Sequence, residues 1–188
     1  MILAEPPFVS VQGEGFTVGR LSLFIRFSGC SFKCEFCDSK FTWVKGSTTV
    51  EYTVSELVRL IEESKFNDIV FTGGEPMLFQ ESIFSVLKAM EYGNLSDKII
   101  EIETTGMVEL NDNLLEILSF SEAKILFNIS PKIDFMDGSA TPKGAAVFVR
   151  IKSPDTPYSD ASGHTETGVF RSVYEVSDWQ KAIADAIE

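Results

Sequence analysis

The sequence predicts an α/β fold whose strands run parallel, in the form of a partial barrel of about six strands. Short apolar runs, typical of buried strands, alternate along the chain with amphipathic stretches, typical of helices. The chain has 188 residues, whereas a closed barrel of eight β/α units typically needs about 250. We therefore expect an open barrel, formed by a single domain over residues 1–188.

The predicted elements follow one another in a regular order. Strands are expected over 21–28, 68–72, 98–103, 124–130, 145–151 and 169–176, and helices over 53–64, 81–92, 111–119 and from Ser177 onward. The first helix has a well-marked start, because a threonine followed three residues later by a glutamate is a capping-box pattern. Residues 153–167 are polar and turn-rich, which predicts a surface loop or a lid.

Composition and charge indicate a globular protein that binds neither nucleic acid nor a membrane. Hydrophobic residues make up 44% of the chain, with 16 phenylalanines, so a sizeable core can form. A net charge of −12 argues against binding of nucleic acid or of an anionic membrane surface. No apolar run approaches the roughly 20 residues that span a bilayer, and the start of the chain does not resemble a signal peptide. We expect a cytoplasmic protein.

All three cysteines lie within eight residues, at Cys30, Cys34 and Cys37. Disulfides between such close neighbours would close very small loops and stabilise little, which favours metal or redox chemistry. A structural zinc site takes four ligands, and the sole histidine, His164, is distant in the sequence. A [4Fe–4S] cluster takes one thiolate per iron, so three thiolates leave one iron open. The alternatives are zinc completed by His164 or an aspartate, and three unrelated buried thiols.

A glycine turn and several polar residues mark the ends of the predicted strands. Residues 73–76 (Gly-Gly-Glu-Pro) follow the strand over 68–72, and two glycines let a ligand approach the backbone closely. Taken alone, this segment is an ordinary turn between a strand and a helix. In folds of this type, however, chemistry gathers where parallel strands end. The turn and the cysteines are therefore expected to share one site.

The spacing C-x3-C-x2-C resembles the signature of the radical S-adenosylmethionine enzymes. The resemblance implies that the open iron is chelated by the amino and carboxylate groups of S-adenosylmethionine. Electron transfer would then break a C–S bond and release a 5′-deoxyadenosyl radical. It also implies that the glycine turn binds the methionyl amino group.

A narrower resemblance, to the 7-carboxy-7-deazaguanine synthase family, covers residues 8–151. Matching segments are residues 11–15, 24–26, 37–39, 41–43, 72–75, 103–106 and 130–132. The resemblance implies a lyase that contracts the ring of 6-carboxy-5,6,7,8-tetrahydropterin to give 7-carboxy-7-deazaguanine, with loss of ammonia, in deazapurine biosynthesis of the queuosine type. S-adenosylmethionine would be regenerated as a cofactor, and Mg²⁺ would support the rearrangement.

The same resemblance implies roles for individual residues. The residues implied to bind S-adenosylmethionine are Phe36, Cys37, Asp38, Gly74, Glu75, Glu103, Ser130, Pro131 and Lys132. Those implied to bind the substrate are Val11, Gln12, Gly13, Glu14, Arg26 and Thr72. The implied magnesium ligand is Ser39. The chemistry is compatible, since a guanidinium pairs with a carboxylate and a hydroxyl is a hard-oxygen ligand for Mg²⁺. On chemistry alone, Arg26 is equally well a surface arginine and Ser39 a turn cap.

The cysteine motif also allows other functions. The activase of anaerobic ribonucleotide reductase shares the cysteine spacing, and a zinc-binding module is the non-enzyme alternative. Arg26, residues 12–15 and residues 130–132 favour the synthase. A homodimer and a flavodoxin-like electron donor are expected. The tail after Ile151 matches the family poorly, although that family often closes its pocket with C-terminal residues. We expect no role for His164.

Overall fold

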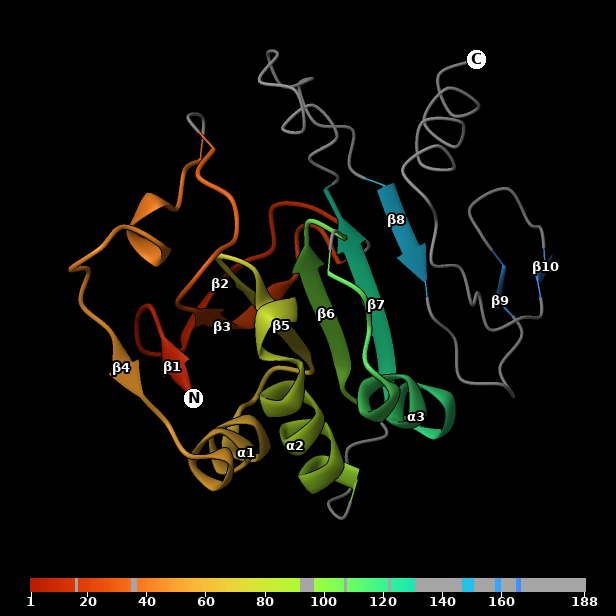
Figure 1. The fold of residues 1–188 in the computed structure, drawn as a ribbon. Helices are drawn as coiled ribbons and strands as arrows, with labels where there is room; N and C mark the ends of the chain where they lie inside the picture. Colours follow the sequence, from red (N-terminus) through yellow and green to blue (C-terminus); the bar gives the residue numbers. More distant parts are fainter. Residues whose placement is uncertain are drawn as a thin grey trace, which may run out of the picture.

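A computed structural model describes residues 1–15, 17–34, 37–91, 97–106, 108–121, 123–130, 147–150, 158–159 and 165–166. Most of these residues form one mixed sheet with three helices beside it (Figure 1). The helices are α1 (Val54–Glu63), α2 (Gln80–Glu91) and α3 (Asp112–Phe120), with short 3-10 helices η1 (Lys40–Thr42) and η2 (Pro76–Phe79). No helix in the described ranges is long and apolar enough to cross a membrane.

The strands of the main sheet have a defined order. They run β4 (Val50–Glu51), β1 (Ile2–Leu3), β3 (Leu21–Phe27), β5 (Asp68–Gly73), β6 (Ile99–Thr104), β7 (Lys124–Ile129) and β8 (Val147–Arg150), and β2 (Phe8–Val11) also pairs with β3. Among the described strands of this sheet, only β3, β5, β6 and β7 are mutually parallel, and the remaining pairs are antiparallel. The α/β prediction is confirmed, with a parallel core of four strands.

The edges of the sheet differ from the expectation of parallel strands throughout. The predicted strand over 145–151 is present as β8, but it runs antiparallel to β7. An antiparallel strand at the edge of an otherwise parallel sheet is common, because an edge strand needs no covering helix on both faces. Within 153–167 the structure describes a small antiparallel pair, β9 (Tyr158–Ser159) and β10 (Thr165–Glu166). The predicted elements from residue 169 onward lie outside the described residues.

The helices begin where the sequence predicts, and the first shows why. The Thr53 hydroxyl accepts a hydrogen bond from the Glu56 backbone N–H at 3.2 Å, and the Glu56 carboxylate accepts one from the Thr53 N–H at 2.7 Å. The capping box is thus complete. The bond from the Thr53 N–H also lowers the pKa of Glu56, because it stabilises the ionised carboxylate.

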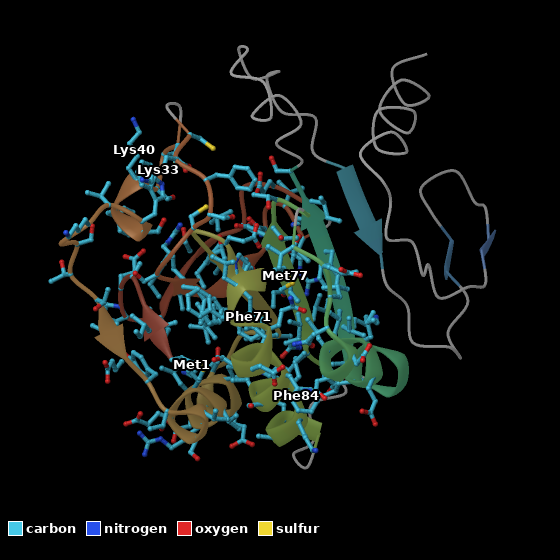
Figure 2. All side chains as sticks on the ribbon, in the orientation of Figure 1. Met1, Lys33, Lys40, Phe71, Met77 and Phe84 are labelled. Atoms are coloured by element: carbon cyan, nitrogen blue, oxygen red, sulfur yellow. The ribbon has the colours of Figure 1, made fainter. Side chains whose placement is uncertain are left out.

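A single apolar core joins the helices to the parallel strands. Its fully buried side chains include Ile25, Phe71, Ile100, Leu57 and Leu114. Figure 2 labels Phe71 and Met77 in the interior and Lys33 and Lys40 at the periphery. Burial on this scale contributes roughly 1.5–3 kcal/mol for each large apolar side chain. The core fixes the register of the four parallel strands, and their carboxyl ends therefore meet at one edge.

Candidate functional site

A cavity of about 720 Å³ opens at the carboxyl ends of the parallel strands. Of the predicted site residues, those that line it are Cys30, Cys34, Cys37, Asp38, Ser39, Gly74, Glu103, Ser130, Val11, Gln12, Gly13, Glu14, Arg26 and Thr72. Segments as distant in the sequence as residues 11–14 and 130 therefore meet in one place. Phe36, Pro131, Lys132 and His164 lie outside the described residues.

The cysteine loop leaves the end of β3 and is anchored at its start. The Gly29 N–H donates to the Thr42 carbonyl at 2.7 Å, and the Gly29 carbonyl accepts from the Glu75 N–H at 2.8 Å. All three cysteines are free thiols. Cys30 Sγ lies 3.4 Å from the Phe32 backbone N–H, and Cys37 Sγ lies 3.4 Å from the indole N–H of Trp43. Both sulfurs therefore already have a donor directed at them.

This loop has the donor set that a [4Fe–4S] cluster uses. Such a cluster takes one thiolate per iron, and hydrogen bonds to its sulfurs tune its potential. Burial raises the pKa of the Cys30 thiol, and the negative charge of Glu75 acts in the same direction, whereas the Phe32 hydrogen bond opposes them. Among the described residues, no group of three or more His, Cys, Asp or Glu side chains is arranged to hold one metal ion. Three free thiols on one loop beside a cavity fit a multi-iron group.

The glycine turn packs directly against the cysteine loop. A Cβ added at Gly74 would overlap the Gly29 carbonyl and approach Cys30 Cβ to 2.9 Å, so only glycine fits there. The Glu75 carboxylate is fully buried and accepts from Thr104 Oγ1 at 2.6 Å and from the Thr105 N–H at 2.8 Å. Glu75 therefore ties β5 to β6. Its side chain is not among those that line the cavity, and its role in binding S-adenosylmethionine stays a prediction.

Arg26 and Ser39 are neighbours at the cavity. One terminal nitrogen of Arg26 donates to Ser39 Oγ at 3.1 Å, and Ser39 Oγ in turn donates to the Asp38 carboxylate at 3.1 Å. Arg26 Nε lies 2.8 Å from the Glu5 carboxylate, an ion-pair distance, although the angle is not that of a hydrogen bond. The guanidinium also lies over the Phe8 ring, 5.4 Å from its centroid. The predicted carboxylate anchor and the predicted magnesium ligand are thus in direct contact.

The side chain of Gln12 is directed into the sheet. It is 2% exposed, and its amide donates to the Glu101 carboxylate at 3.3 Å and to the Glu103 carboxylate at 2.9 Å. The Glu103 carboxylate also accepts from Thr72 Oγ1 at 2.5 Å. The two carboxylates therefore fasten the segment around Gln12 over the ends of β5 and β6.

Sequence reasoning missed two buried polar residues in this region, Glu101 and Asn128. Asn128 lines the cavity and donates to the Glu101 carboxylate, which also accepts from Thr17 Oγ1. The available signal was the strand period of two, because each residue lies two positions before a predicted site residue, Glu103 or Ser130. A polar residue inside an otherwise apolar strand at that spacing faces the same side as the predicted site residue.

Comparison with proteins of known sequence finds relatives of this chain. Over 107 residues the chain is 39% identical to the 7-carboxy-7-deazaguanine synthase of Clostridium acetobutylicum, in a match that covers 57% of this chain and 47% of that protein. It is 33% identical over 131 residues to the 7-carboxy-7-deazaguanine synthase of Pyrobaculum aerophilum, in a match that covers 67% of this chain and 53% of that protein. The chain spans about half the length of these relatives. The predicted resemblance to the synthases is confirmed.

A solved structure and a family model extend the comparison. The crystal structure of QueE from Escherichia coli matches with a TM-score of 0.54 at 24% identity, covering 71% of this chain and 61% of that one, and it supports the fold. The family model described as "4Fe-4S single cluster domain" matches residues 11–145, which include the cysteine loop and all four parallel strands. The chain therefore belongs to the 4Fe-4S single cluster domain family.

Proposed function

We propose that the chain is a radical S-adenosylmethionine enzyme that converts 6-carboxy-5,6,7,8-tetrahydropterin to 7-carboxy-7-deazaguanine with loss of ammonia. The observation that carries the proposal is the meeting of three free thiols, Arg26 and residues 11–14 around one cavity. Similarity to proteins named as 7-carboxy-7-deazaguanine synthases supports the same substrate. The cavity of about 720 Å³ is of a size typical for small-molecule sites.

The cysteine loop and the glycine turn form the cofactor half of the proposed site. Cys30, Cys34 and Cys37 would each bind one iron of a [4Fe–4S] cluster, in the cavity that Gly74 and Ser130 also line. When bound, the cluster supplies the electron that splits S-adenosylmethionine and yields the 5′-deoxyadenosyl radical. The N–H groups of Phe32 and Trp43 would donate to the cluster-bound sulfurs of Cys30 and Cys37.

Arg26 and Ser39 form the substrate half of the proposed site. The guanidinium of Arg26 would bind the substrate carboxylate. Its ion pair with Glu5 would then be kept beside the substrate carboxylate or replaced by it. Ser39, which contacts both Arg26 and Asp38, would hold Mg²⁺ together with oxygens from substrate and water. Because these groups are adjacent, one substrate carboxylate can meet the guanidinium and the metal ion together.

The remaining proposals concern the assembly. We infer a partial barrel formed by a single domain over residues 1–188, a homodimer, a cytoplasmic location and a flavodoxin-like electron donor. The four parallel strands and their adjacent helices support the partial barrel. A net charge of −12 is consistent with a small-molecule substrate and with the absence of a nucleic-acid partner.

An anaerobic assay tests the proposed reaction. The protein is reconstituted with iron and sulfide, then mixed with S-adenosylmethionine, Mg²⁺, a reductant and carboxytetrahydropterin. We expect 7-carboxy-7-deazaguanine to accumulate over many turnovers, without matching loss of S-adenosylmethionine, as followed by mass spectrometry. Consumption of one S-adenosylmethionine per turnover, or activation of a glycyl-radical partner while the pterin is untouched, would contradict the proposal. Zinc in place of a visible-absorbing cluster would favour the metal-binding module.

Replacement of Arg26 by alanine is expected to weaken substrate binding and leave S-adenosylmethionine binding unchanged. A hydrogen bond to a charged group contributes roughly 1.5–3 kcal/mol, so the substrate Kd should rise about tenfold to a hundredfold. Calorimetric titration of the reconstituted enzyme measures both ligands. Arg59 is a matched control, since it is an exposed arginine on α1 with a weak 3.8 Å ion pair. Equal substrate affinity in Arg26→Ala and the unmodified enzyme would rule out the anchor role.

A further inference from the structure

The side chain of Asn128 is buried, yet half of its amide has no partner. Asn128 is 4% exposed and lines the cavity. Its Nδ2 donates to the Glu101 carboxylate, whereas Oδ1, which is also buried, has no hydrogen-bond donor within the described part of the chain. Buried acceptors in native proteins nearly always have a donor, so the unpaired state of Asn128 Oδ1 needs an explanation.

Two neighbours fix which way the amide faces. The NH₂ side of Asn128 is directed at the Glu101 carboxylate, which accepts its hydrogen bond. The backbone of Gly15 covers that same side, because a Cβ added there would overlap Asn128 Nδ2 and Glu101 Oε1. The NH₂ side is therefore enclosed by protein. The carbonyl oxygen is left without a donor among the described residues, on a side chain that lines the cavity.

Strand register places Asn128 in the same row as the substrate residues. Arg26 on β3 is paired with Thr72 on β5, and Glu103 on β6 is paired with Asn128 on β7. The hydrogen bond of 2.5 Å from Thr72 to Glu103 joins the two halves of the row. Neighbouring strands lie about 4.8 Å apart, so Arg26 and Asn128 stand roughly 14 Å apart at opposite ends of the row. A ligand that is held by Arg26 and follows this row would reach towards Asn128.

We propose that Asn128 Oδ1 accepts a hydrogen bond from the exocyclic amino group of the bound pterin, with Glu101 as the positioning residue that orients the amide. The inference rests on the proposed function for its substrate. In carboxytetrahydropterin the carboxylate and the amino group lie at opposite ends of the fused ring, which matches the two ends of the row. The carboxylates of Glu101 and Glu103 already accept from Gln12, Thr17 and Thr72, whereas Asn128 Oδ1 has no donor among the described residues.

Equilibrium binding tests the proposal without turnover. The reconstituted enzyme with S-adenosylmethionine, but without reductant, is titrated with carboxytetrahydropterin and with the corresponding lumazine, in which a carbonyl oxygen replaces the amino group. The unmodified enzyme should bind the pterin with a Kd at least about tenfold lower than that of the lumazine. The reason is that the lumazine carbonyl oxygen would face Asn128 Oδ1, and neither oxygen can donate a hydrogen bond to the other. In Asn128→Leu, the Kd values of the pterin and the lumazine should lie within about twofold of one another, and the affinity for S-adenosylmethionine should be unchanged.

Two further variants separate recognition from stability. Glu101→Gln should reduce the preference for the pterin, because a glutamine amide can both donate and accept and so lets the Asn128 amide turn. Ser22 on β3 is the matched control, since its hydroxyl is also buried without a partner in the described ranges, but it does not line the cavity. Ser22→Ala should leave both affinities unchanged.

The outcomes are distinguishable. Equal binding of pterin and lumazine by the unmodified enzyme would overturn the role of Asn128, whether or not the variants fold. An unchanged preference in Asn128→Leu would also overturn it, while tight pterin binding would leave the proposed function standing. An unchanged preference in Glu101→Gln would remove the positioning role of Glu101. Failure of the unmodified enzyme to bind carboxytetrahydropterin at all would overturn both the proposed function and this inference.

Discussion

Replacement of any one of Cys30, Cys34 and Cys37 by alanine is expected to abolish S-adenosylmethionine cleavage. Two thiolates cannot hold three irons of a cluster while leaving the fourth open, so the site-differentiated [4Fe–4S] cluster should be lost. The expected effect is complete loss of activity rather than a reduction. Visible absorption, iron and sulfide content, and cleavage of S-adenosylmethionine after anaerobic reconstitution measure it.

The same loop provides a control for the cysteine replacements. Lys33 lies between Cys30 and Cys34 in the sequence, and its exposed side chain is at the periphery in Figure 2. Lys33→Ala should therefore retain the full iron and sulfide content. A variant in which all three cysteines are replaced, but which still binds a full complement of iron and sulfide, would show that the cluster ligands lie elsewhere.

The cysteine site and the main elements could be predicted because their signals are local. Three cysteines within eight residues belong to one loop wherever the rest of the chain goes. The strand before that loop, β3, is mainly apolar, and its residues Leu23, Phe24, Ile25 and Phe27 are buried, which is typical of a strand covered on both faces. The helix α1 begins at a capping box that four consecutive residues encode. Such features depend little on tertiary structure.

The features that sequence reasoning missed depend on contacts between distant segments. Glu101 accepts from Gln12 and Thr17, which are 89 and 84 residues away along the chain. The period of a strand shows which face a residue occupies, but not which side chain meets it there. The direction of β8 was missed for a related reason, since apolar periodicity is the same in parallel and antiparallel strands.

The polar residues around the cavity also show how an acidic chain forms this site. Glu101 and Glu103 share the Gln12 amide as a donor, and the hydrogen bonds to Glu75, Glu101 and Glu103 come from hydroxyl, amide and backbone N–H donors. These donors offset the loss of water on burial without introducing a competing cation. The guanidinium of Arg26 therefore stands out as a positive group at the cavity, which suits a substrate carboxylate.

The segment that carries Gln12 should be especially sensitive to a methyl group at Gly15. Gly15 has a φ of +74°, and an added Cβ would overlap the side chains of Asn128 and Glu101. A left-handed conformation costs a residue with a Cβ about 1–2 kcal/mol, and overpacking adds roughly 1–3 kcal/mol. Gly15→Ala is thus expected to lower the free energy of unfolding by about 2–5 kcal/mol and to weaken substrate binding, while the cysteine loop still takes up iron and sulfide.

Two other glycines in the same segment separate the two causes. Gly19 has a φ of +85°, but no atom of the described residues lies within 4 Å of an added Cβ, so Gly19→Ala should show only the backbone cost of about 1–2 kcal/mol. Gly13 has no positive φ, and an added Cβ there would have no neighbour within 4 Å in the described part of the chain, so Gly13→Ala should change the free energy of unfolding by less than about 0.5 kcal/mol. Chemical denaturation of the full chain measures all three variants. If Gly15→Ala costs no more than Gly19→Ala, the Gly15 backbone does not pack against Asn128 and Glu101, and the enclosure of the Asn128 amide is wrong.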